Sequence, residues 1–126
     1  NKNNMNSILR IRPSPKNEEC ANYVIVNNKT LETTLEGGKK SFSFDEIFNS
    51  NTSQSDFFDG TIKDLLVRFY ESNKSELIFT YGMTGSGKTH TIVGNEGNPG
   101  ILPRSVEYML KKKNIENEMD NNNTIK

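Results

Sequence analysis

The first part of the chain places short apolar runs between polar turn residues, which is the pattern of consecutive β-strands. Ser7–Arg12 is one such run, and it ends at Pro13, which lacks the amide N–H that a sheet ladder needs. Three more runs follow, separated by the pairs Asn27-Asn28 and Gly37-Gly38. Turn residues at this spacing predict a small antiparallel meander, with strands at Tyr23–Val26, Thr30–Leu35 and Lys40–Phe44.

The middle of the chain changes to a helical period. Apolar residues recur at spacings of three and four between Ser53 and Tyr70, which predicts one amphipathic helix. Ser53 and Asp56 are a candidate capping box at its start. Gly60 lies inside this helix and costs about 1 kcal/mol relative to alanine. The apolar stripe consists of Phe58, Ile62, Leu65, Leu66 and Phe69.

The last part of the chain begins with a short apolar run at Glu76–Thr80, which predicts a buried strand. Gly94–Gly100 contains three glycines and a proline and predicts a loop. Pro103 suits the first turn of a final helix, in which Glu107 can pair with Lys111. The predicted buried stripe of this helix is Val106, Met109 and Leu110.

The C-terminal residues are rich in asparagine and glutamate. We therefore expect the last helix to fray into a loop from Asn114 onward, and a further strand to begin near Thr124. Residues 1–6 and 114–126 are predicted to be flexible, because they are polar and lie at the two ends.

A glycine-rich motif follows the strand predicted at Glu76–Thr80. Tyr81–Thr91 reads Y-G-M-T-G-S-G-K-T-H-T and contains the phosphate-loop pattern G-x-x-x-x-G-K-[ST]. Glycines allow backbone conformations that a Cβ forbids, and the loop's amide N–H groups can form a nest for phosphate. A helix is predicted to begin at Lys88, directing its positive end at the same anion. The predicted nucleotide-binding residues are Gly82, Met83, Thr84, Gly85, Ser86, Gly87, Lys88 and Thr89.

Two of these residues have specific roles. Lys88 is the predicted catalytic residue, because its mobile charge can reach the β- and γ-phosphates, and Thr89 is the predicted Mg²⁺ ligand. At ordinary residue frequencies the four fixed positions arise by chance at about 10⁻⁵ to 10⁻⁴ per start position. The predicted order of strand, glycine loop and helix is the context that supports a phosphate loop. It indicates an α/β fold of the phosphate-loop NTPase type, with a mostly parallel or mixed central sheet flanked by helices.

Composition excludes several other classes. Lys plus Arg and Asp plus Glu both number 16 among 126 residues, so no net field attracts nucleic acid or an anionic membrane. No apolar run approaches membrane-spanning length, and no signal peptide is visible. Cys20 is the single cysteine, which rules out a disulfide within the chain and fits a reducing compartment.

The sequence around the loop is more specific than the loop alone. The stretch I-F-T-Y-G-M-T-G-S-G-K-T-H-T-I-V-G, followed by G-I-L-P-R, resembles the kinesin motor domain. The upstream pieces R-I-R-P, F-S-F-D-E-I-F and S-Q-S-D-F-F fall in that family's order, so the resemblance runs from about Ser7 to about Leu110. One departure is Met83, where the family usually has glutamine.

This resemblance implies a microtubule motor that binds ATP or ADP with Mg²⁺ and couples ATP hydrolysis to movement on, or remodelling of, microtubules. It further implies an adenine site that includes Arg10, Arg12, Pro13 and His90. Microtubules would bind through segments beyond this chain, and the full-length protein would be a dimer. The implied location is the cytoplasm, on microtubules or the spindle, with neither nucleic acid nor a membrane as partner.

Several alternatives remain open from the residues. R-x-R-P alone could be a strand edge with two exposed arginines, and His90 could be a catalytic base rather than a group that stacks on adenine. Lys111–Lys113 could meet an acidic partner such as tubulin, although lysines at a helix end also favour the helix dipole. The whole protein could instead be another phosphate-loop ATPase, a nucleotide kinase, or a motor-like module that binds nucleotide without turnover.

The resemblance also predicts that residues 1–126 are the opening part of a motor domain. In the kinesin pattern, two switch stretches follow the helix near Pro103. They would supply the group that orients water and the sensor of the γ-phosphate. We therefore expect this segment alone neither to hydrolyse ATP appreciably nor to bind microtubules in a nucleotide-dependent way.

Overall fold

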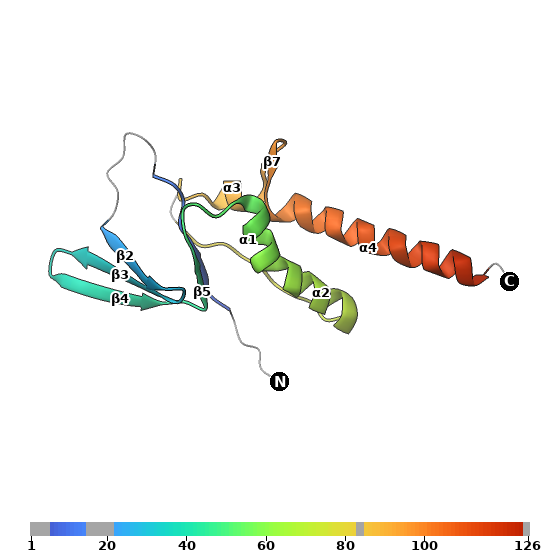
Figure 1. Cartoon of the computed structure of the whole chain (residues 1–126), viewed down its shortest axis with the longest axis horizontal. Helices are drawn as coiled ribbons and strands as arrows, with labels where there is room; N and C mark the ends of the chain where they lie inside the picture. Colours follow the sequence, from blue (N-terminus) through green and yellow to red (C-terminus); the bar gives the residue numbers. More distant parts are fainter. Residues whose placement is uncertain (1–5, 15–21, 83–84, 125–126) are drawn as a thin grey trace. The chain divides into compact units, whose positions relative to one another are not determined.

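The computed structural model describes residues 6–14, 22–82 and 85–124 and divides the chain into two compact units, residues 1–52 and 53–126 (Figure 1). The first unit contains β1 (Ile8–Arg10), β2 (Tyr23–Asn27), β3 (Thr30–Leu35), β4 (Gly38–Ser43) and β5 (Glu46–Phe48). The second contains α1 (Gln54–Gly60), α2 (Ile62–Ser72), α3 (Lys88–Ile92), β6 (Gly94–Asn95), β7 (Asn98–Pro99) and α4 (Ile101–Thr124).

The strand predicted at Ser7–Arg12 is confirmed as β1, which pairs in parallel with β5. The pairing begins at Asp45, whose carboxylate accepts a hydrogen bond of 2.6 Å from the Ser7 amide. The Asp45 amide donates in return to the Ser7 carbonyl at 2.8 Å. Beyond the strand, the Ile11 amide donates to the Phe48 carbonyl at 2.9 Å. These bonds fix the backbone immediately before Arg12 and Pro13.

The predicted meander is also confirmed, because β3 pairs antiparallel with both β2 and β4. At the first turn, the Asn27 side chain accepts a hydrogen bond of 2.8 Å from the Lys29 amide, as asparagine commonly does in turns. The second turn passes through Gly37 and Gly38, which both have positive φ. The Asn28 carbonyl accepts from the Ile47 amide at 2.8 Å and so attaches the meander to β5.

The single helix predicted over Ser53–Tyr70 is wrong in one respect, because Thr61 divides it into α1 and α2. The Ser53 side chain accepts from the Asp56 amide at 3.0 Å, which confirms the predicted cap. At the break, the Thr61 hydroxyl donates to the Phe57 carbonyl at 2.6 Å. Gly60 is a poor helix former, and this back-bonding of threonine competes with a continuous helix. Phe57, Phe58 and Ile62 are buried, so the two short helices still share an apolar side.

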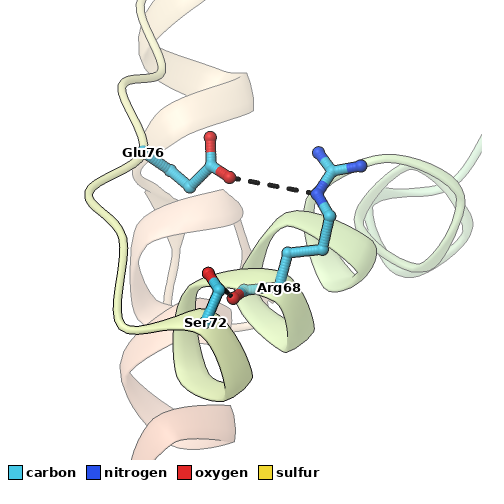
Figure 2. Close-up of polar contacts among 3 residues, drawn as sticks. All are labelled: Arg68, Ser72 and Glu76. Atoms are coloured by element: carbon cyan, nitrogen blue, oxygen red, sulfur yellow. Dashed lines mark hydrogen bonds and ion pairs between the residues drawn. The ribbon is translucent and has the colours of Figure 1, made fainter. Parts of the chain in front are cut away.

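The buried strand predicted at Glu76–Thr80 is also wrong. These residues have no regular secondary structure, and Leu77 and Tyr81 are 84% and 98% exposed. A strand needs a hydrogen-bonding neighbour, and in the part of the chain that the structure describes no strand pairs with this segment. The segment contacts α2 through an ion pair, in which Arg68 Nε lies 3.9 Å from Glu76 Oε1 (Figure 2).

The loop predicted at Gly94–Gly100 forms a tight hairpin of two two-residue strands, β6 and β7. Gly100 is buried where the hairpin ends, and its amide donates to the Val93 carbonyl at 3.0 Å. A Cβ at Gly100 would lie 2.5 Å from the Thr91 carbonyl oxygen. Glycine therefore allows the start of α4 to lie directly against the end of α3.

Two predictions for α4 are wrong. Val106 and Leu110 are exposed rather than buried, and they line an open groove between α4 and the β6–β7 hairpin. The helix also continues to Thr124 instead of becoming a loop at Asn114, so Thr124 begins no strand. No glycine or proline interrupts the helix after Pro103, and asparagine costs less than about 1 kcal/mol per residue in a helix.

A tertiary contact reinforces this helical continuation. The Tyr70 hydroxyl on α2 donates to the Glu116 carboxylate on α4 at 2.6 Å, and this hydrogen bond raises the pKa of Tyr70. The predicted pair of Glu107 and Lys111 is confirmed at 2.9 Å, and it lowers the pKa of Glu107. Lys112 lies 6.0 Å from the centroid of the Tyr70 ring. Within the described residues, no helix is both long and apolar enough to cross a membrane.

Candidate functional site

The glycine motif forms the connection that leads into α3. Gly85 and Gly87 adopt φ angles of +82° and +104°, which L side chains rarely adopt. A Cβ at Gly82 would lie 2.5 Å from Ser86 Oγ and 3.3 Å from Ser86 Cβ, so the first glycine of the motif lies directly against Ser86. Met83 and Thr84, which were also predicted to bind nucleotide, lie outside the described residues.

The helix begins at Lys88, as the sequence predicts. Gly87 caps it, and the Gly87 carbonyl accepts the first helical hydrogen bond from the Thr91 amide at 2.9 Å. Lys88 is half-buried, whereas the next two side chains, Thr89 and His90, are exposed. The predicted catalytic residue and the predicted metal ligand therefore lie next to each other in the first turn of α3.

This arrangement fits a phosphate group. Apart from its chain neighbours, no atom of the described residues would lie within 4 Å of a Cβ at Gly85, so the described structure leaves this backbone accessible to a ligand. Lys88 supplies the positive charge. Mg²⁺ typically takes one or two protein ligands and completes its shell with water and phosphate oxygens. The Thr89 hydroxyl can supply one such oxygen ligand. The described residues contain no cluster of three His, Cys, Asp or Glu side chains that could hold a metal ion.

The predicted adenine-binding residues fall in both units. Arg10 ends β1, is half-buried and donates to the Thr52 carbonyl at 3.4 Å. This burial lowers the pKa of Arg10. Arg12 and Pro13 follow it on exposed backbone. The structure thus brings these three residues together in the first unit, and His90 lies beside the phosphate motif in the second. That they meet across one adenine stays a prediction.

The structure adds one residue to those predicted for the site. Gln54 is the first residue of α1, and its side chain is only 4% exposed. Its Nε2 donates a hydrogen bond of 2.7 Å to the carbonyl of His90 on α3. Gln54 lies within the S-Q-S-D-F-F piece that carries part of the family resemblance, but nothing in that pattern indicates which backbone group its side chain would contact.

Comparison with known proteins agrees with the motif and its setting. A family model described as the kinesin motor domain matches residues 10–126. The chain belongs to the kinesin motor domain family. Mouse kinesin-like protein KIF23 is 38% identical over 112 residues, which are 80% of this chain and 12% of the relative. Human kinesin-like protein KIF20B is 48% identical over 73 residues, which are 55% of this chain and 4% of the relative.

Solved structures show the same fold for this kinesin chain. A kinesin 6 structure superposes with a TM-score of 0.68 at 31% identity and covers 79% of this chain. A structure of a fast kinesin superposes with a TM-score of 0.72 at 27% identity and covers 82% of this chain. The chain spans 26% and 31% of those two structures. The parallel pair β1–β5, the antiparallel meander and the helices are consistent with part of an α/β motor domain, which confirms the predicted class.

Proposed function

We propose that this kinesin chain carries the nucleotide-phosphate site of a microtubule motor that hydrolyses ATP. The observation that supports it most directly is the placement of Lys88 and Thr89 in the first turn of α3, directly after the positive-φ glycines Gly85 and Gly87. The solved fast kinesin supports the same proposal, since its description concerns its ATPase mechanism and its interactions with microtubules. Membership of the kinesin family argues against a nucleotide kinase or an unrelated phosphate-loop ATPase.

Each residue of the site has a distinct role in this proposal. The backbone amides between Gly82 and Lys88 surround the phosphates, and the Lys88 ammonium neutralises charge on the β- and γ-phosphates. The Thr89 hydroxyl would be one ligand of Mg²⁺, which would neutralise part of the phosphate charge. Arg12 or Arg10 stacks on the adenine with Pro13, because a guanidinium stacks well on aromatic faces. His90 lies against the same base.

The wider function follows from this chemistry. Hydrolysis transfers the γ-phosphoryl group to water, and the protein contributes mainly positioning and charge stabilisation. The free energy would drive movement on microtubules or their remodelling, in a dimeric protein located on the cytoplasmic cytoskeleton. Lys111 forms an ion pair with Glu107 on α4, and Lys112 lies over the ring of Tyr70 on α2. Because these contacts give the two lysines a structural role, we assign microtubule binding to other segments.

The decisive experiment compares Lys88→Ala with Lys113→Ala in the full-length protein. Lys113 is an exposed lysine on α4 and controls for the loss of one positive charge. We expect Lys88→Ala to weaken Mg·ATP binding in calorimetric titration more than about tenfold, since hydrogen bonds to charged groups contribute about 1.5–3 kcal/mol. Lys113→Ala should bind as the wild type does. Equal affinity of all three proteins would remove Lys88 from the site.

Phosphate release separates a motor from a module that only binds nucleotide. We expect release by the full-length wild type to accelerate when microtubules are added. Tight ATP binding with no release at any microtubule concentration would contradict the motor assignment and leave nucleotide binding intact.

A further inference from the structure

The short helix α3 has little stability of its own. It contains five residues, Lys88–Ile92, which is scarcely more than one turn. Isolated helices shorter than about 12–15 residues are marginal in water, because nucleation costs more than the first hydrogen bonds return. The positions of Lys88 and Thr89 must therefore depend on contacts between α3 and its surroundings.

The C-terminal end of α3 supplies such a contact. The carbonyls in the last turn of a helix have no intrahelical donor, and the chain leaves the helix at Gly94, where φ is +65°. The Thr89 carbonyl still accepts from the Val93 amide at 2.8 Å. The next carbonyl, that of His90, accepts instead from Gln54 Nε2 at 2.7 Å.

Gln54 is itself held firmly. It is the first residue of α1, directly after the Ser53 cap, and it precedes the buried Phe57 and Phe58. Its side chain is almost fully removed from solvent, and a buried amide that loses its partner carries a desolvation penalty. The contact thus joins a well-packed helix to the helix that bears the phosphate-binding residues.

We propose that Gln54 is a positioning residue of the nucleotide site. It acts through the His90 carbonyl, by fixing the orientation of α3 and therefore of Lys88 and Thr89 relative to the glycine motif. It does not touch the nucleotide. This inference rests on the proposed nucleotide-binding function and adds to it a residue in a separate helix that sets the affinity for Mg·ATP.

The test compares two variants of the full-length protein that each remove a buried side-chain donor. Gln54→Met keeps the length of the side chain and removes the donor to α3. Thr61→Val removes the donor to the Phe57 carbonyl. Thr61 follows the last residue of α1, at the end opposite to Gln54. Both variants should lower the melting temperature by similar amounts. Only Gln54→Met should also raise the dissociation constant for Mg·ATP, by about fivefold, which is the effect of one lost hydrogen bond.

A third variant tests the donor directly. Gln54→Glu presents a carboxylate to the His90 carbonyl, and two acceptors repel each other. Burial raises the pKa of a carboxyl group, and the protonated form can donate a hydrogen bond again. The affinity of Gln54→Glu for Mg·ATP, relative to the wild type at the same pH, should therefore recover as the pH falls.

The outcomes separate this inference from the function on which it rests. If the wild type binds Mg·ATP and Lys88→Ala does not, but Gln54→Met binds as the wild type does, Gln54 has no positioning role and the phosphate site stands. Equal weakening by Gln54→Met and Thr61→Val would also overturn it, because affinity would then follow stability alone. If the wild type binds no Mg·ATP, the proposed function fails and this inference fails with it.

Discussion

His90 is the one histidine of the chain, and its exposed side chain follows Thr89 at the start of α3. An exposed imidazole beside a phosphate site could either stack on the base or move a proton. Hydrolysis takes place at the γ-phosphate, whereas the base lies at the other end of the nucleotide. The stacking role is therefore the better explanation of a planar side chain at this position.

The two roles predict different kinetics. We expect His90→Ala to weaken ATP binding by about 1–3 kcal/mol, which is the contribution of one base–aromatic stack. His90→Phe is the matched control, because it keeps a planar ring and removes the titratable nitrogens, so its affinity should stay near that of the wild type. If His90→Phe lost several orders of magnitude in hydrolysis at saturating ATP, a general base would be the correct assignment.

Residues differ in how well the sequence predicts their roles. The place of Lys88 and Thr89 at the start of α3 is predictable, because phosphate chemistry fixes their spacing from Gly82 and Gly87. Their roles at a nucleotide stay predictions. Gln54 is not predictable, since its role depends on which carbonyl lies opposite it in three dimensions. The shared adenine contact of Pro13 and His90 is predicted by the family resemblance alone. It stays a prediction, because the two residues belong to separate units.

At the scale of elements, local signals predict local structure well. Paired turn residues located the three meander strands, and Ser53 located the start of α1. The segment Glu76–Thr80 has the apolar composition of a buried strand, yet a strand forms only where another strand can pair with it. Likewise, the asparagines after Asn114 suggest a loop, but the bond from Tyr70 to Glu116 holds that part of α4 against α2.

The β6–β7 hairpin depends on a close backbone approach that can be tested. A Cβ at Gly100 would overlap the Thr91 carbonyl and the Ile92 backbone, neither of which can move as a side chain could. We expect Gly100→Ala to lower the free energy of unfolding of the full-length protein by about 1–3 kcal/mol, the usual cost of overpacking. Denaturant titration monitored by circular dichroism would measure this change.

Gly97 provides the control for that measurement. It lies in the turn of the same hairpin, and a Cβ there would meet only the Asn95 side-chain oxygen at an ordinary 3.7 Å. Gly97→Ala should therefore leave the unfolding midpoint nearly unchanged. Equal losses of unfolding free energy in both variants would show that any added side chain destabilises the hairpin. The close approach of Gly100 to the α3 backbone would then not explain the effect.

At the scale of the whole chain, the described residues bury few apolar side chains. The hydrophobic residues classed as buried are Leu31, Ile47, Phe57, Phe58, Ile62 and Ile101, and none of the described large side chains is completely buried. Large apolar side chains remain exposed at Leu77, Phe79, Tyr81, Val106 and Leu110. Exposed apolar patches of this kind commonly mark surfaces that other protein segments cover.

This surface leads to a prediction for residues 1–126 expressed alone. Because folding depends on burying apolar area, we expect the segment to unfold with weak cooperativity and to bind a dye that reports exposed hydrophobic surface, unlike the full-length protein. It should also release no phosphate from ATP above background, with or without microtubules, because the resemblance assigns the water-orienting group and the γ-phosphate sensor to switch segments that follow α4. Thermal melts, dye fluorescence and a phosphate-release assay on both proteins would measure these differences. Microtubule-stimulated turnover by the segment alone would show that the catalytic groups lie within residues 1–126 and that the exposed apolar residues need no covering segment.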